Sequence, residues 1–149
     1  MQAASPPLEY ELVVEDLATS APIGVLSLSG IDQHNKKAEF CCYFARRRNS
    51  RSLIEAMHLG FHCAFQALQL RKVICHYAPE NRNVAGILSS LCFTTEGILR
   101  GELLDDKGSA RDLIRASLFI DDWEAAGGPR DRLNFIAPLM LDGFRELRP

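Results

Sequence analysis

Alternating apolar and polar positions along the first half of the chain predict β-strands. Residues 10–14 and 23–29 are two such runs, and the turn-forming residues 19–22 separate them, so we expect a β-hairpin. Residues 38–44 form a third β-prone run after a polar loop. A short β-branched run at residues 72–77 predicts a fourth strand.

The spacing of apolar residues changes to three and four after the third of these runs, which indicates amphipathic helices. One helix is predicted over residues 52–68. A second helix is predicted to follow an N-cap at Asn81 or Asn83 and to end near residue 91.

Two further strands are predicted at residues 92–96 and 113–120, joined by a polar loop at residues 100–111. They are expected to pair as an antiparallel ribbon. The order of strands and helices therefore predicts a mixed α/β (α+β) domain.

The two ends of the chain differ from this pattern. Residues 1–9 contain two prolines and are expected to be a flexible lead-in to a domain at residues 10–123. Residues 124–149 contain a Gly-Gly-Pro break at residues 127–129, after which residues 130–149 carry apolar residues at roughly helical spacing. Because this tail is too apolar to remain exposed, we expect it to dock on the domain, on a second copy, or on a protein partner.

Composition narrows the function without identifying it. The chain has 149 residues, of which 47% are hydrophobic, which suits one domain. Its net charge of -2 gives no general attraction to nucleic acid. The sequence contains neither an apolar run long enough to span a bilayer nor a signal-peptide pattern, so the expectation is a cytoplasmic protein without a membrane partner.

The cysteines and histidines are weak candidates for metal binding. Five cysteines, an odd number without a CxxC pair, are expected to be buried reduced thiols rather than disulfides or ligands. His58 and His62 have a spacing that could hold a metal on one helix face, but no third ligand accompanies them. No metal is therefore expected.

Short motifs in a fixed order point to a known family. Pro22-Ile23-Gly24 and Ala38-Glu39-Phe40 precede the long helix, Pro79-Glu80-Asn81 precedes the second, and Leu91-Cys92-Phe93 and Asp122-Trp123 follow. In this order the chain resembles the GNAT superfamily of N-acetyltransferases, in its ribosomal-protein and spermidine acetyltransferase branch. The resemblance implies a mostly antiparallel sheet with a central, splayed pair of parallel strands and flanking helices.

The resemblance also implies where acetyl-coenzyme A binds. In the family the thioester arm lies between the two splayed strands, here residues 38–44 and 72–77, and contacts strand backbone. The pyrophosphate lies at the N-terminus of the next helix, where the partial positive charge of the helix end favours it. The residues implied for the coenzyme are Cys42, Tyr43, Phe44, Arg46, Arg48, Asn49, Ser50, Arg51, Ser52 and Asn81.

For the chemistry, an amine would attack the acetyl thioester directly and would need a base. Glu39 is the first candidate and His76 the second, because both stand on strands that flank the expected opening. The alternative interpretations are a solvated or salt-bridged strand residue for Glu39 and an ordinary half-buried histidine for His76. For Asn81 the alternative is a plain helix cap, and for the arginines a solvated basic turn.

Several positions depart from the family pattern. Arg51 and Leu53 stand where the phosphate loop has small residues, Leu88 where a tyrosine often protonates the leaving thiolate, and Cys92 where a turn glycine is usual. The strand and two helices that usually come first are expected to be missing. Two hypotheses follow: an acetyl-coenzyme A-dependent N-acetyltransferase acting on a small-molecule or protein N-terminal amine, or a catalytically weak domain that binds a ligand or partner. Either would suit a homodimer or a protein partner held through the C-terminal tail.

Overall fold

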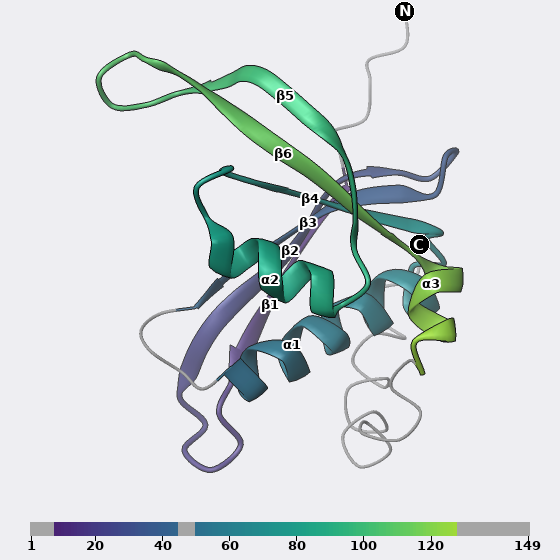
Figure 1. Ribbon diagram of the computed structural model, residues 1–149. Helices are drawn as coiled ribbons and strands as arrows, with labels where there is room; N and C mark the ends of the chain where they lie inside the picture. Colours follow the sequence, from purple (N-terminus) through teal and green to yellow (C-terminus); the bar gives the residue numbers. More distant parts are fainter. Residues whose placement is uncertain (1–7, 45–49, 128–149) are drawn as a thin grey trace, which may run out of the picture.

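The computed structural model describes residues 8–44 and 50–127, which form one six-stranded sheet with helices (Figure 1). The strands are β1 (Leu8–Glu15), β2 (Pro22–Asp32), β3 (Lys37–Phe44), β4 (Lys72–Tyr77), β5 (Thr94–Leu104) and β6 (Ala110–Phe119). The helices are α1 (Ser50–His62), continued by a π-helical turn at Cys63–Ala67, then α2 (Arg82–Ser90) and α3 (Ile120–Ala125).

The sheet is antiparallel except at its centre. Its strand order is β1-β2-β3-β4-β6-β5, and only β3 and β4 pair in parallel among the described residues. This confirms the mixed, mostly antiparallel sheet that the sequence predicted, with its parallel pair at the expected strands.

Alternation along the strands gives the sheet two different faces. On β3, Phe40 is buried among the core side chains, whereas Glu39 and Tyr43 are exposed on the other side. We call the first side the core face and the second the outer face. The core contains residues from the core face, from α1, and from α2, so both helices pack on the core face.

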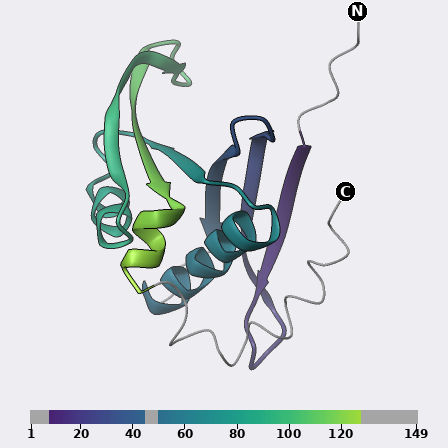
Figure 2. The same ribbon diagram turned by 90° about the vertical axis from the view of Figure 1, so that its right-hand side faces the viewer.

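Helix α1 packs closely on the sheet because Gly60 has no side chain. A Cβ atom at this position would stand 2.6 Å from Cε2 of Phe40 and 3.2 Å from a methyl carbon of Leu26. Helix α1 accordingly lies along the part of the sheet formed by β1 to β3 (Figure 2). The apolar stripe predicted for this helix is buried as expected, at Ala56, Met57 and Phe61.

The structure corrects three sequence predictions. The predicted loop at residues 100–111 is mostly strand, and only a short turn between Leu104 and Ala110 joins β5 to β6. The long helix changes to a π-helical turn at Cys63–Ala67 instead of continuing as α-helix to residue 68. The cysteines are not uniformly buried, because Cys41 and Cys92 are exposed.

The ribbon of β5 and β6 extends beyond the rest of the sheet (Figures 1 and 2). Gly101 lies inside a register shift of β5, at a positive φ of 61°, and its N–H donates to the carboxylate of Asp112 over 2.8 Å. A turn held by the Asp105 carboxylate, which accepts from the N–H groups of Lys107 and Ser109, closes the ribbon. These hydrogen bonds stabilise the polar end of the ribbon, at residues 100–111, as two paired strands joined by a turn.

The end of α2 explains one departure from the family pattern. Cys92 has a φ of 66°, in the left-handed region that glycine adopts most easily, and the N–H of Phe93 donates back to Leu88. This is the Schellman arrangement that ends many helices, with its usual apolar contact pair at the same two positions. The position that carries a glycine in the family therefore has the backbone shape of one here.

A candidate active site where two strands separate

The parallel strands β3 and β4 separate near the middle of the sheet. Their register runs from Lys37 opposite Lys72 to Glu39 opposite Ile74. Both strands then continue, as residues 40–44 of β3 and 75–77 of β4, and we call the gap between these segments the split. Each strand keeps its other neighbour, because β3 pairs with β2 to Phe44 and β4 pairs with β6 to Tyr77.

One side-chain bond crosses the split at its closed end. The thiol of Cys75 donates to the backbone carbonyl of Phe40 over 3.3 Å. The Phe40 carbonyl therefore points across the split. Because backbone groups alternate along a strand, the N–H and C=O groups of Cys42 and Phe44 point the same way. Cys42 and Phe44 are two of the three strand residues that were predicted from the sequence to contact the coenzyme. Tyr43, the third, stands opposite Val25 of β2, and its side chain is exposed on the outer face.

Glu39 and His76, the two candidate bases, lie together on the outer face. His76 Nδ1 is 3.6 Å from Glu39 Oε1, and the two side chains are 19% and 57% exposed. His76 Nε2 is buried and has no hydrogen-bond partner among the described residues. The structure thus joins two residues that the sequence nominated separately, one from each side of the split.

A polar network lies beside β4 at the closed end of the split, and sequence reasoning missed it. The Glu96 carboxylate pairs with Lys72 and accepts from Arg115 Nε over 3.0 Å and from the Ser117 hydroxyl over 2.8 Å. The Lys72 ammonium, followed by the Ser117 and Arg115 bonds, outweighs burial and lowers the pKa of Glu96 to about 2. In register, Arg115 stands opposite His76, so the network borders the candidate bases.

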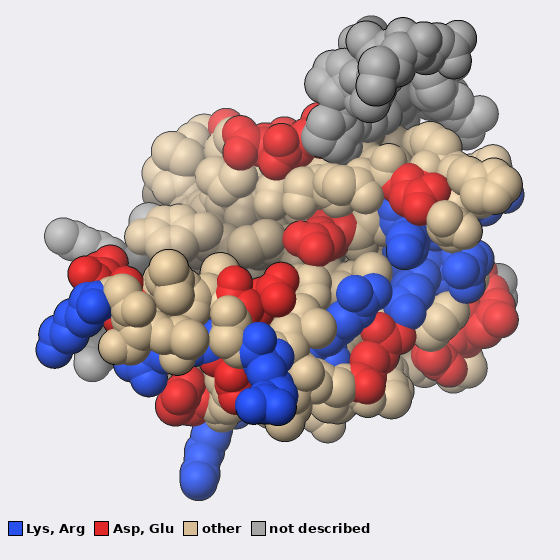
Figure 3. Space-filling model, turned by 90° about the horizontal axis from the view of Figure 1, so that it is seen from above, with Lys and Arg blue, Asp and Glu red and all other residues tan. Residues whose placement is uncertain are grey.

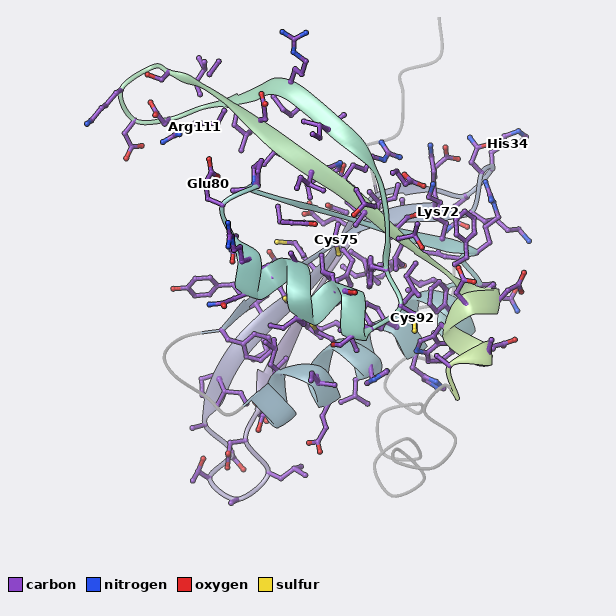
Figure 4. All side chains as sticks on the ribbon, in the orientation of Figure 1. His34, Lys72, Cys75, Glu80, Cys92 and Arg111 are labelled. Carbon is purple, nitrogen blue, oxygen red and sulfur yellow. The ribbon has the colours of Figure 1, made fainter. Side chains whose placement is uncertain are left out.

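Glu96 reaches these partners because β5 bulges at this residue. The register between β5 and β6 shifts between Thr95 and Gly97. A bulge turns a side chain out of the regular alternation, which no pattern in a single sequence reveals. Figure 4 shows where these partners lie along β4, with Lys72 at the end nearer to α3 and Cys75 farther along the strand.

Two thiols at the split, those of Cys42 and Cys75, have raised pKa values. Burial, with a smaller contribution from Cys41, raises the pKa of Cys42 to about 11. Burial also raises the pKa of Cys75. Neutral thiols are poor nucleophiles, in agreement with direct transfer to an amine rather than through an acyl-cysteine.

The residues predicted at the start of α1 are only partly described. Arg46, Arg48 and Asn49 lie outside the described residues. Ser50, Arg51 and Ser52 form the first turn of α1, which begins at Ser50. Helix α1 begins six residues after the end of β3, at Ser50, so the residues predicted for the coenzyme between Cys42 and Ser52 lie close together along the chain.

Asn81 is the N-cap of α2. Its Oδ1 accepts from the N–H of Val84 over 3.2 Å, which confirms the capping interpretation. Any contact with a coenzyme would come from its side-chain Nδ2 donor. Leu88, on the same helix, is 4% exposed and belongs to the core.

The other predicted ligands and charges give no second site. Burial lowers the pKa of His62, and among residues 8–44 and 50–127 no group of three or more potential metal ligands is found. Acidic and basic side chains are mixed over the lower part of the face shown in Figure 3, so no purely basic patch stands out there. Within the described residues, no helix has the length and apolar character to cross a membrane.

The tail predicted at residues 124–149 lies, beyond Gly127, outside the described residues.

Comparison with known proteins identifies the family. The sequence model of the "Acetyltransferase (GNAT) domain" matches residues 1–94. YdaF of Bacillus subtilis (strain 168), named as a candidate ribosomal N-acetyltransferase, is 30% identical over 102 residues, which is 68% of this chain. The chain spans only 55% of the length of YdaF.

Solved structures with the same fold are also acetyltransferases. The spermidine N-acetyltransferase of Vibrio cholerae in complex with CoA and spermine has a TM-score of 0.71 and 25% identity, over 78% of this chain and 68% of that one. A dodecameric structure of the spermidine N-acetyltransferase from Vibrio cholerae has a TM-score of 0.71 and 26% identity, over 77% and 67%.

Proposed function

The chain belongs to the acetyltransferase (GNAT) family, and we propose that it transfers an acetyl group from acetyl-coenzyme A to a primary amine by direct attack. The observation that carries this proposal is the pairing of Glu39 with His76, 3.6 Å apart, at the point where β3 and β4 separate. In the proposed reaction this pair would serve as a base beside a gap lined with backbone hydrogen-bonding groups.

The split would hold the thioester arm. The N–H and C=O groups of Cys42 and Phe44 point across it and match the amides of the pantetheine arm. A backbone N–H here would also stabilise the oxyanion that forms when the amine attacks. The phosphates would lie at the first turn of α1, with Arg46, Arg48 and Arg51 as charge-assisted donors and Asn49, Ser50 and Ser52 beside them.

Glu39 is the acceptor of the amine proton in this mechanism, and His76 supports it. The amine nitrogen forms a bond to the thioester carbonyl carbon, the carbon–sulfur bond breaks, and the coenzyme leaves as a thiolate. The proton lost by nitrogen passes to the Glu39 and His76 pair. Because Leu88 has no proton to give, the thiolate takes its proton from water.

A second function is favoured by the burial of Leu88. The position that often carries the acid tyrosine is filled by a core leucine, so a domain that binds the coenzyme with slow turnover is the alternative.

The proposed classes of acceptor amine are a small polyamine, an amino sugar, and a protein N-terminus. A homodimer is also proposed, and light scattering on the full chain tests it, because a stable monomer would contradict it.

Turnover decides between the two functions. Release of free coenzyme A thiol from acetyl-coenzyme A is followed with spermidine, glucosamine, or a peptide with a free N-terminal amine. The proposal expects release that depends on one of these amines and saturates with it. Binding of acetyl-coenzyme A without release above the rate in buffer for any amine would favour the binding domain.

A further inference from the structure

The closed end of the split separates two different chemical surroundings. On the outer face it is bordered by the polar pair of Glu39 and His76. On the core face it is bordered by buried side chains, with Phe40 at 4% and Cys75 at 7% exposure. A thioester held in the split, as the proposed function requires, would have the base on one side and apolar side chains on the other.

The direction of attack fixes how the acyl group lies. A nucleophile approaches a carbonyl carbon roughly at right angles to the carbonyl plane, and the base on the outer face brings the amine from that side. The thioester plane is then roughly parallel to the sheet. With the sulfur and its arm directed toward the open end of the split, the acyl chain extends toward the closed end.

Cys75 stands at that closed end. It is the first residue of β4 after the last pair with β3, and its thiol bridges to the Phe40 carbonyl over 3.3 Å. This contact holds the Cys75 sulfur at the closed end of the split, on its core-face side, where an acyl chain directed away from the open end would meet it. Val73, two residues earlier on the same face of β4, is fully buried.

We propose that Cys75 limits the acyl group to two carbons, so that the site selects acetyl over longer acyl thioesters. This inference rests on the proposed function and adds its acyl specificity. Burial keeps the thiol protonated, so that the bridge to Phe40 persists at neutral pH. The site would therefore present a fixed barrier rather than a reactive group.

Calorimetric titration of the full chain with coenzyme A, acetyl-coenzyme A and propionyl-coenzyme A tests this inference. The wild-type chain should bind propionyl-coenzyme A roughly 10-fold more weakly than acetyl-coenzyme A, the scale of discrimination that one methylene gives. Cys75→Ala, which removes the sulfur, should bring the two affinities within about two-fold of each other. Cys75→Ser, which keeps a donor of similar size, should retain most of the preference.

Cys63→Ala is the matched control, because Cys63 is also a buried thiol, at 1% exposure, and lies in the π-helical turn away from the split. It should keep the wild-type preference. If Cys75→Ala does not fold, Cys75→Val takes its place, and its extra methyl group should weaken acetyl-coenzyme A relative to coenzyme A by about five-fold or more.

The outcomes separate this inference from the proposed function. Equal binding of acetyl and propionyl thioesters by the wild-type chain, or a preference that Cys75→Ala leaves unchanged, would overturn the role of Cys75 alone. Failure of the wild-type chain to bind any of the three coenzyme forms would overturn the proposed function and this inference with it.

Discussion

Glu39 Oε1 and His76 Nδ1 lie 3.6 Å apart, although the two residues belong to different strands of the parallel pair. The register explains this, because Glu39 stands opposite Ile74 and His76 follows two residues later on the same face. The strands begin to separate at this point. The place where β3 and β4 separate is thus also where a carboxylate meets an imidazole.

We expect substitution of this pair to slow acetyl transfer. Glu39→Gln removes the proton acceptor and should lower kcat by roughly 100-fold or more, as is typical for loss of a general base. His76→Gln should have a smaller effect, and the double variant should be no slower than Glu39→Gln, because residues that act as a unit are not additive. The measurement is amine-dependent release of thiol.

Glu11→Gln is the control for this prediction, since Glu11 is an exposed carboxylate on the outer face of β1. It should retain the wild-type rate. A Glu39→Gln variant that turns over as fast as Glu11→Gln, with intact coenzyme binding, would remove Glu39 from the mechanism.

The Glu96 network should make stability depend on pH. The folded pKa of Glu96, about 2, is below its ordinary value of 4.5, so the folded state favours the ionised form. Its contribution is fully present above pH 4.5 and is lost as pH falls toward 2. After allowance for solvent screening, we expect the ionised Glu96 to contribute about 1 to 2 kcal/mol to the free energy of unfolding at neutral pH.

Urea unfolding of Glu96→Gln and wild type between pH 7 and pH 2.5 measures this contribution. The difference in free energy of unfolding should be largest at neutral pH and should shrink at the acid end. Glu102→Gln, an exposed carboxylate on the same strand, should differ little from wild type at either pH. A pH-independent difference for Glu96→Gln would show that packing, not charge, is responsible.

Cys92→Gly should stabilise the protein. A non-glycine residue at a φ of 66° is strained, and relief of that strain is expected to outweigh the added entropy of the unfolded chain. The gain in free energy of unfolding should be about 1 kcal/mol. Cys92→Ala keeps the Cβ atom and should give no comparable gain, so equal effects of the two variants would argue against backbone strain.

Two glycines in helices should respond oppositely to alanine. Gly60→Ala should lower the free energy of unfolding by about 1 to 3 kcal/mol, because its Cβ would stand 2.6 Å from Phe40. At Gly86, in α2, an added Cβ would meet no atom within 4 Å. Gly86→Ala should therefore raise the free energy of unfolding by about 0.5 to 1 kcal/mol, because alanine has the higher helix propensity. Thermal unfolding compares them, and a stabilising Gly60→Ala would mean that α1 does not pack as closely as described.

Much of the fold could be predicted because most strands bury only one face. Residues 72–77 were predicted as a strand and are β4, and the turn at Asn81 was predicted as a cap and is one. The ribbon was harder, because residues 94–104 of β5, with Leu99 as the exception, are exposed and show no alternation of buried and exposed positions. The π-helical turn at Cys63–Ala67 leaves the helical spacing of apolar residues almost unchanged, so the sequence could not indicate it.

The candidate site was predictable residue by residue but not as an arrangement. Glu39 and His76 could each be chosen from their strands, but their contact depends on the register of the parallel pair, which no sequence pattern sets. Glu96 could not be chosen at all, because its role depends on a bulge. The coenzyme residues from Arg46 to Asn49 lie outside the described residues, so their role remains a prediction from the family resemblance.

The central claim is that the chain binds acetyl-coenzyme A in the split with the phosphates at the start of α1. Calorimetric titration of the full chain with acetyl-coenzyme A tests it most directly, with Arg48→Ala and Arg51→Ala measured beside wild type. We expect saturable binding with a Kd on the order of micromolar, about −8 kcal/mol, weakened roughly 10-fold by either variant. Absence of binding to the wild-type chain, or binding that both variants leave unchanged, would contradict the account.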